Sequence, residues 1–338
     1  MLPELRLIFA IALVISWTCG TILNSSILAV YLSAWKKGLD LGACNQIILT
    51  MACTNLLLQN ILTFHLIFLI YRLYILFAKE IFLAAASFIF NFSISLSFWL
   101  TAWLTSYYCV RLVDFSNRFF FRLKTGISSV VTYWLLGTVV TLFIIQVPLI
   151  WKLEIRTYQN RTTIYNNVNK NFELMLCNAI FACFLPTSIT SFCIGLSLMS
   201  LLRHVWRMKQ NTSEFWNPQL KSHIKACRTM ILLLTVNVIF FLAIFISSLK
   251  LEYTRQYISW FIMLSIPSGQ AIILLFGNSS LMSLLRHVRR MKQNNSQSWS
   301  GKMKTHARAC MAIFLLLALN LFFFLTVFIS IILKFNIA

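Results

Sequence analysis

The sequence has few charged residues. They make up 11% of its 338 positions, whereas soluble domains carry about 25%. Hydrophobic residues make up 59% of the chain, and the mean hydropathy is +0.79. A chain of this composition cannot bury its apolar side chains in a water-soluble globule. The composition therefore excludes soluble enzymes and indicates a membrane protein.

Acidic residues are especially scarce, with 8 Asp and Glu against 29 Lys and Arg, which gives a net charge of +21. Such an excess of positive charge is also found in proteins that bind nucleic acids. Here, however, the basic residues lie in short runs between apolar spans, as they do in the cytoplasmic loops of membrane proteins. We therefore predict that the chain contacts a lipid bilayer and no nucleic acid.

Motifs for metal or redox chemistry are also missing. The nine cysteines are scattered and form no C-x-x-C pair, and the five histidines are dispersed along the chain. Zinc sites and redox motifs need closely spaced ligands of these types. The sequence thus predicts no metal site, no cofactor and no enzymatic activity.

Apolar runs long enough to cross a bilayer as helices occur seven times before residue 281. They span residues 7–32, 45–71, 81–110, 127–151, 174–202, 229–249 and 257–280. An eighth run, at 311–333, is equally apolar. The start of the chain lacks the basic region and cleavage site of a signal peptide, so the first run is interpreted as an uncleaved anchor. We predict an all-α membrane protein, a bundle of seven transmembrane helices with an extra C-terminal apolar helix.

The charges of the loops alternate along the chain. Four segments together hold 19 of the 29 Lys and Arg, namely 33–44, 111–126, 203–228 and 281–310. The positive-inside rule places these segments in the cytosol and the N-terminus outside the cell. The longest outer loop, 152–173, contains the sequence Asn160-Arg161-Thr162, where a glycan can be attached to Asn160. We predict a multi-pass plasma-membrane protein with an extracellular N-terminus.

Several signatures of rhodopsin-like receptors are absent. The sequence has no D-R-Y after the third span, no C-W-x-P in the sixth and no N-P-x-x-Y in the seventh. The usual outer disulfide is excluded as well, because residues 72–90 and 152–173 contain no cysteine. Seven spans alone therefore do not assign the chain to that group.

Four motifs, in a fixed order, are present instead. They are FWLTAWLTSYYCVRLVDFSNRFFFRLK at 98–124, LPTSITSFCIGLSLMSLLRHVWRMK at 185–209, NPQLKSHIKACRTM at 217–230 and IPSGQAIILLFGN at 266–278. In these motifs the chain resembles the type 2 (bitter) taste receptor family over about residues 1–285. The resemblance implies a G-protein-coupled receptor that binds small organic tastants in an outer helical pocket. It also implies activation of a heterotrimeric, gustducin-like G protein.

The chain departs from the family pattern at several positions. Asn237 stands where the family has a tyrosine in the sixth span, and Gln270 stands where it has a histidine in the seventh. Ser280 replaces a lysine after the seventh span. In the family, residues at these positions take part in the change between inactive and active receptor. The departures therefore affect the prediction of signalling activity more than the resemblance to the family.

Candidate ligand contacts lie in the outer parts of the spans, as judged from a helical rise of about 1.5 Å per residue. Polar groups without partners are costly inside a membrane, which favours a functional interpretation of the two polar candidates, His65 and Asn91. The others are aromatic and apolar side chains whose alternative role is packing or lipid contact. The predicted ligand-binding residues are His65, Phe90, Asn91, Ile94, Phe240, Phe241, Trp260 and Met263.

Candidate G-protein contacts are the basic residues of the cytosolic segments that follow the third span and flank the sixth. Attraction to anionic lipids of the inner leaflet is an alternative role for the same charges. The predicted G-protein-facing residues are Arg111, Arg118, Lys124, Arg207, His223 and Lys225.

One stretch occurs twice. Residues 197–211 and 280–294 agree at 14 of 15 positions, and the similarity extends to 30 identities over 51 positions when 197–247 is aligned with 280–330. We therefore divide the chain into three parts. Residues 1–285 form the seven-helix receptor domain, 286–310 a cytosolic basic tail, and 311–333 an extra hydrophobic helix that repeats 228–250. The repeat has three possible explanations. They are a duplication within the gene, a fusion of two receptor genes with a non-functional product, and a functional extra helix.

Two other kinds of function are compatible with seven spans. A pheromone-type (vomeronasal-like) chemoreceptor is one, because the outer halves of the spans carry little family signal. A transporter or channel is the other. It is disfavoured because the repeat covers only two spans in parallel orientation and because charges deep within the spans are nearly absent.

Overall fold

The computed structural model describes residues 3–36, 42–71, 80–113, 118–151, 154–158, 161–165, 177–210, 218–248 and 253–277. Its long helices are α1 (Pro3–Lys36), α2 (Ala43–Tyr71), α3 (Glu80–Leu112), α4 (Arg118–Trp151), α6 (Leu185–Gln210), α7 (Pro218–Ser248) and α8 (Tyr253–Gly277). A π-helical turn, η2 (Ile180–Phe184), leads into α6.

Seven helices of the described part are long and apolar enough to cross a membrane, and each corresponds to one of the seven spans before residue 281. The predicted all-α membrane fold is thereby confirmed. Three predictions fall outside the described residues: the basic tail at 286–310, the extra helix at 311–333 and the glycosylation of Asn160.

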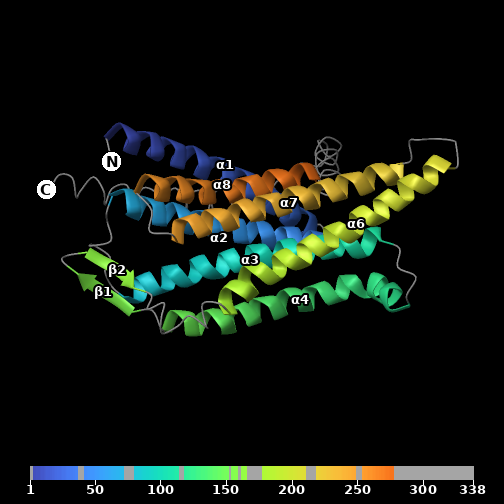
Figure 1. The fold of residues 1–338 in the computed structure, drawn as a ribbon, viewed down its shortest axis with the longest axis horizontal. Helices are drawn as coiled ribbons and strands as arrows, with labels where there is room; N and C mark the ends of the chain where they lie inside the picture. Colours follow the sequence, from blue (N-terminus) through green and yellow to red (C-terminus); the bar gives the residue numbers. More distant parts are fainter. Residues whose placement is uncertain are drawn as a thin grey trace, which may run out of the picture.

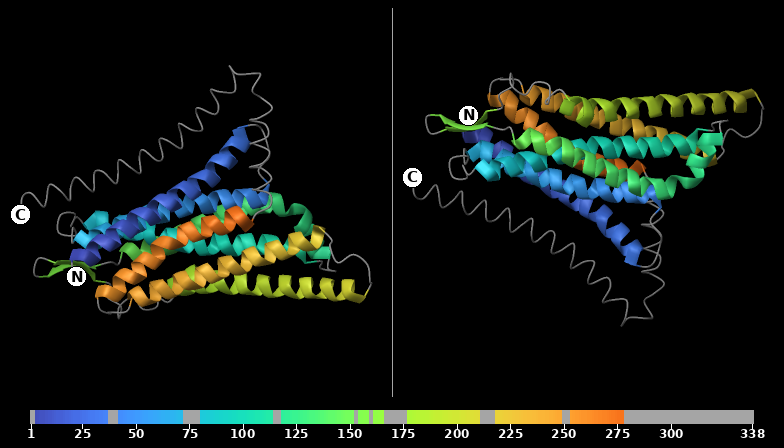
Figure 2. Two further views of the ribbon diagram at one scale, coloured as in Figure 1. Left: turned by 90° about the horizontal axis from the view of Figure 1, so that it is seen from above. Right: turned by 90° about the horizontal axis from the view of Figure 1, so that it is seen from below.

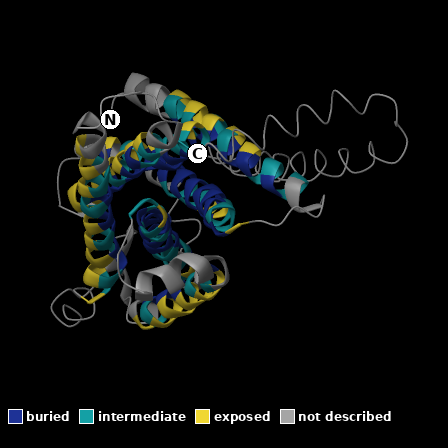
Figure 3. Ribbon diagram, turned by 90° about the vertical axis from the view of Figure 1, so that its right-hand side faces the viewer, coloured by how far each residue is buried: buried dark blue, intermediate teal, exposed yellow. Residues whose placement is uncertain are grey.

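The helices form an elongated bundle with α3 at its centre, in contact with α2, α4, α6 and α7. Helices α1, α8, α7 and α6 follow one another round one side of it (Figure 2). Seen end-on, the buried residues gather on the inner faces of the helices, while the exposed ones face outward (Figure 3). Many of the exposed side chains are large and apolar, so in a membrane this outer surface contacts lipid.

The described β structure is a hairpin between α4 and η2, which the sequence analysis had assigned to a loop. Strand β1 (Glu154–Tyr158) pairs antiparallel with β2 (Arg161–Tyr165), with Tyr158 opposite Arg161. The hairpin lies at the end of the bundle where α1 begins (Figure 1), here called the hairpin end. Helices α2, α4 and α7 run toward this end, and α1, α3, α6 and α8 run toward the opposite end.

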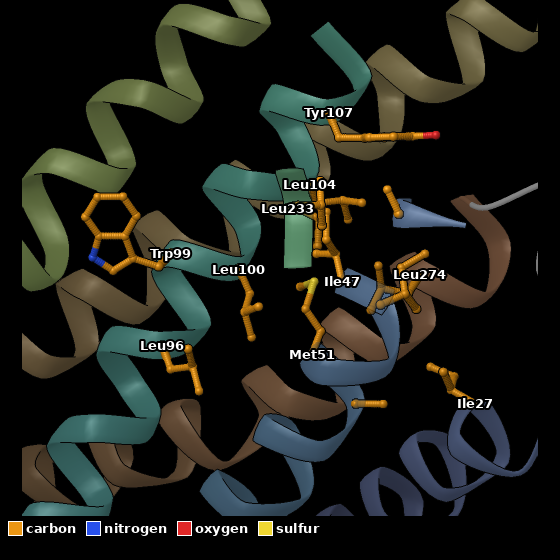
Figure 4. Close-up of a cluster of buried hydrophobic side chains, with 14 of the residues drawn as sticks. Ile27, Ile47, Met51, Leu96, Trp99, Leu100, Leu104, Tyr107, Leu233 and Leu274 are labelled. Carbon is orange, nitrogen blue, oxygen red and sulfur yellow. The ribbon is translucent and has the colours of Figure 1, made fainter. Parts of the chain in front are cut away.

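The largest cluster of buried apolar side chains among the described residues joins six helices, α1, α2, α3, α4, α7 and α8. Met51 of α2 and Leu100 of α3 lie at its centre, where Leu233 of α7 and Leu274 of α8 meet them (Figure 4). All four are essentially inaccessible to solvent. Since lipid is as apolar as leucine, such close packing, rather than avoidance of water, holds helices together in a membrane.

Two glycines permit especially close approaches between helices. A Cβ atom added at Gly20 of α1 would collide with the amide of Gln59 on α2 and the hydroxyl of Ser268 on α8. A Cβ atom added at Gly277 would likewise collide with Thr229 of α7. Gly20 therefore sets the spacing among α1, α2 and α8, and Gly277 fixes the end of α8 against α7.

Polar side chains within the spans divide into two groups. Most Ser and Thr hydroxyls donate to the carbonyl four residues earlier in their own helix, as Thr50 does to Gln46 (2.9 Å) and Thr190 to Pro186 (2.8 Å). The buried amides instead reach neighbouring helices, as Gln146 of α4 does to Ser95 of α3 (3.1 Å). Most of the hydroxyls are thus satisfied within their own helix, whereas the buried amides connect different helices.

A set of such amides connects α1 to α8 at Pro267, which has no N–H and therefore interrupts the hydrogen bonding of its helix. The Asn24 amide donates to the Pro267 carbonyl (3.3 Å) and to the Gly20 carbonyl (2.9 Å). The Asn55 amide of α2 donates to Asn24 Oδ1 (3.3 Å). Three helices are thus joined beside the proline.

Candidate functional site

Three rings from three helices meet near the hairpin end. The centroid of the His65 imidazole on α2 lies 5.5 Å from that of Phe90 on α3 and 5.6 Å from that of Trp260 on α8. The Phe90 and Trp260 centroids are also 5.6 Å apart. Each ring therefore contacts the other two, and we call this group the ring triad. All three residues were predicted as ligand contacts from the sequence.

Apolar side chains pack against the ring triad in one buried cluster. Ile94 of α3, Phe240 of α7 and Met263 of α8 belong to it, and each is buried. Phe240 also stacks on Phe98 of α3, with 5.9 Å between the ring centroids. The structure thus brings six of the eight predicted ligand residues into a single cluster contributed by four helices.

The remaining two predicted residues take other positions. The Asn91 side chain is partly buried, and its amide donates to the Ser87 carbonyl of its own helix (2.8 Å). Phe241 is 46% exposed, whereas Phe240 is fully buried. Successive residues of an α-helix point about 100° apart, so the two phenylalanines cannot both face the bundle. Phe240 is part of the cluster, and Phe241 faces outward.

The His65 side chain contributes an unpaired polar atom to this apolar surrounding. Its Nε2 atom is buried and has no hydrogen-bond partner among the described residues. The neighbouring polar group Asn60, by contrast, accepts a hydrogen bond from the Trp17 indole (3.2 Å) and donates one to the Leu56 carbonyl (2.8 Å). The polarity of His65 was visible in the sequence, but its lack of a partner was not.

A second polar group lies deeper in the bundle, between the ring triad and the opposite end. The Gln270 amide of α8 donates to Asn237 Oδ1 on α7 (3.1 Å) and to Ser97 Oγ on α3 (3.1 Å). All three side chains are buried. Asn237 and Gln270 are two of the positions where the sequence departs from the bitter taste receptor pattern. The structure shows that the side chains at these two positions are hydrogen-bonded to each other.

The predicted G-protein-facing residues lie toward the opposite end, although the structure describes only some of their side chains. Arg111 is exposed near the end of α3, and its guanidinium donates to the Tyr107 hydroxyl one turn earlier (2.9 Å). His223 and Lys225, near the start of α7, are partly buried. For Arg118 and Lys124 at the start of α4, and for Arg207 near the end of α6, only the backbone is described.

Within the described ranges, no three His, Cys, Asp or Glu side chains come together in a group that would hold a metal ion. The eight cysteines in these ranges are all free thiols. The described side chains of the ring triad and its surrounding cluster present aromatic and apolar surface together with the buried, unpaired Nε2 atom of His65.

Comparison with known proteins gives a consistent result. The sequence model described as taste receptor protein (TAS2R) matches residues 1–282, which include every described helix, and matches again over residues 281–337. The second match covers the C-terminal segment that repeats 197–247.

Individual relatives are similar over most of their length. The chain is 27% identical to taste receptor type 2 member 40 of Gallus gallus over 285 residues, which is 80% of this chain and 90% of the relative. It is 28% identical to taste receptor type 2 member 30 of Homo sapiens over 317 residues, covering 86% and 93% of the two chains. Against taste receptor type 2 member 43 of Papio hamadryas the identity is 29% over 299 residues, covering 85% and 95%.

Proposed function

Since the chain belongs to the taste receptor (TAS2R) family, we propose that it is a bitter-taste-type chemosensory receptor. In this proposal it binds a small organic ligand at the hairpin end and activates a heterotrimeric, gustducin-like G protein at the opposite end. Ligand binding shifts the bundle between inactive and active arrangements, since a ligand stabilises whichever arrangement it binds more tightly.

The orientation follows from the distribution of charge. The protein is a multi-pass membrane protein with seven helices able to cross the bilayer among its described residues. We propose that it resides in the plasma membrane with its N-terminus and hairpin outside, because the sequence segments that adjoin the other ends of the helices (33–44, 111–126, 203–228 and 281–310) hold 19 of the 29 Lys and Arg. Attachment of a glycan at Asn160, between the two strands, is part of the same proposal.

The ring triad is the observation that carries the ligand-binding half of the proposal. His65, Phe90 and Trp260 come from three different helices, so a molecule inserted among them contacts α2, α3 and α8 at once. Because the rings already contact one another, binding has to separate at least one of these pairs. A ligand therefore changes the spacing of helices whose other ends lie at the proposed G-protein face.

The test of the proposed function is a ligand-evoked response in cells. The full chain is expressed with a gustducin-type G protein, its surface level is measured, and a broad panel of bitter compounds is applied. We expect at least one compound to raise intracellular calcium in these cells and not in cells lacking the receptor. Silence of a well-expressed receptor across the whole panel would contradict the proposal.

Replacing Trp260 with alanine is expected to raise the half-maximal concentration of an active compound at least about tenfold. Aromatic anchors at the centre of a binding site contribute about 2 kcal/mol or more, and about 1.4 kcal/mol corresponds to a factor of ten. The matched control is Phe241→Ala, which removes an outward-facing aromatic ring of α7. Calcium responses are compared at equal surface level. If the half-maximal concentration rose equally in the two variants, Trp260 would not be a ligand contact.

Replacing Arg111 with glutamine is expected to lower G-protein activation about fivefold without changing the half-maximal ligand concentration. The exposed guanidinium lies toward the proposed G-protein face, and an ion pair with a partner at such a position contributes about 1 kcal/mol. Nucleotide exchange on the purified G protein is the measurement. Tyr107→Phe, which removes only the hydroxyl that Arg111 contacts, is the control and should retain activation. Unchanged exchange in the Arg111 variant would exclude this residue from coupling.

A further inference from the structure

The unpaired His65 nitrogen limits the chemistry of a ligand at the ring triad. Buried polar atoms in folded proteins are nearly always hydrogen-bonded, and an exception in a native structure calls for an explanation. Leaving such an atom without a partner is unfavourable, because no hydrogen bond compensates for its loss of hydration. His65 Nε2 is buried, has no partner in the described part of the chain, and lies within a ring system that faces Phe90 and Trp260.

The other side chains of the cluster do not compete for this nitrogen. Ile94, Phe240 and Met263 have no group that hydrogen-bonds to an imidazole. The Ser259 hydroxyl, one residue before Trp260, already donates to the Ala243 carbonyl. A ligand hydroxyl placed among the rings would therefore meet the His65 imidazole and the Trp260 indole N–H, and of these two groups only the imidazole can accept a hydrogen bond.

Charge gives a second constraint. The segments that build the cluster on α2, α3, α7 and α8 are 58–67, 86–98, 236–244 and 258–266, and none of them contains Asp, Glu, Lys or Arg. An ionised ligand placed there would lose its hydration without gaining an ion pair, which is strongly unfavourable in a membrane interior. The site thus selects against charged molecules.

We propose, on the basis of the function proposed above, that the ligand is a neutral, flat aromatic molecule carrying a hydroxyl group that hydrogen-bonds to His65 Nε2. Aromatic rings favour edge-to-face and offset contacts with other rings, which the triad offers from three helices. A hydroxyl both donates and accepts, so it satisfies Nε2 whichever ring nitrogen of His65 carries the proton.

Two probes of nearly equal shape isolate the hydroxyl. They are 2-naphthol and 2-methylnaphthalene, which differ by a hydroxyl in place of a methyl group. Each is titrated against the purified full chain in lipid nanodiscs, and affinity is obtained from the rise in melting temperature with probe concentration. We expect wild type to bind 2-naphthol at least about tenfold more tightly, as one buried hydrogen bond implies.

The His65→Phe variant keeps a ring at this position and removes its nitrogens. We expect its preference for 2-naphthol to fall to within about twofold, while Phe241→Leu on the outward face of α7 keeps the wild-type preference. A wild type without preference, a His65→Phe variant that retains it, or failure of both probes to bind would overturn the ligand-class inference. This measurement involves no G protein, so the cell response to the bitter panel still decides the proposed function separately.

Discussion

Replacing Gly20 with valine is expected to remove most of the folded protein from the cell membrane. Any side chain at this position would occupy the place of the Gln59 amide and the Ser268 hydroxyl. Gln59 is fully buried and donates to the carbonyls of Ser16 (2.9 Å) and Trp17 (3.2 Å), so it cannot move aside without breaking both bonds. Overpacking and lost hydrogen bonds each cost about 1–3 kcal/mol. Together they approach the whole stability of a typical domain, about 5–15 kcal/mol.

The measurement is the surface fraction of an N-terminally tagged full chain, with the melting temperature of the solubilised protein as a second readout. Gly20→Ala should give an intermediate loss, because it adds one carbon atom where valine adds three. Gly137→Val is the matched control, since a Cβ atom there would meet nothing within 4 Å. If Gly20→Val reached the surface as well as this control, the close approach of α1 to α2 and α8 would be incorrect.

Replacing Gln270 with leucine is expected to destabilise the bundle by about 1–2 kcal/mol. The change keeps the approximate volume of the side chain but removes the hydrogen bonds to Asn237 on α7 and Ser97 on α3. Hydrogen bonds between membrane helices contribute about 0.6 kcal/mol on average, and a buried acceptor left unpaired adds its own penalty. For a protein of this size, the melting temperature in detergent should fall by about 2 °C.

A double-mutant cycle separates this contact from general damage. Asn237→Leu alone should also destabilise the protein, because it leaves the Gln270 amide with fewer partners. The combination of the two leucines should cost less than the sum of the single changes, because neither polar group of the pair remains buried and unpaired. If the decrease in melting temperature of the double variant equalled the sum of the two single decreases, the two residues would not interact.

The positions of the helices could be predicted from the sequence, whereas the faces they present could not. Seven apolar runs separated by polar loops specify seven spans, and the structure confirms them. Side-chain direction is harder to predict, because lipid accepts apolar residues as readily as the interior does. Phe240 and Phe241 are identical residue types on an almost uniformly apolar segment, yet one is buried and the other is 46% exposed. Hydrophobicity therefore cannot predict which of the two side chains is buried.

Polar residues were more informative because they are rare within the spans. The sequence identified His65, Asn237 and Gln270 as unusual, and all three occupy defined positions in the bundle. It could not show that Asn237 and Gln270 contact each other across 33 positions, because that contact depends on how α7 packs against α8. The hairpin was missed for a related reason. Its strands are five residues each and are stabilised by pairing with each other rather than by an apolar pattern.

The division between locally satisfied hydroxyls and interhelical amides has a consequence for biosynthesis. A helix whose Ser and Thr hydroxyls bond to its own backbone, as Thr50 and Thr190 do, can leave the translocon and enter lipid alone without exposing these groups unsatisfied. Asn24, Gln146 and Gln270 gain their interhelical partners only when a second helix arrives. We therefore expect the helices to insert into the membrane before these interhelical bonds form. The amides do not favour insertion, but their interhelical hydrogen bonds favour the association of helices that have already inserted.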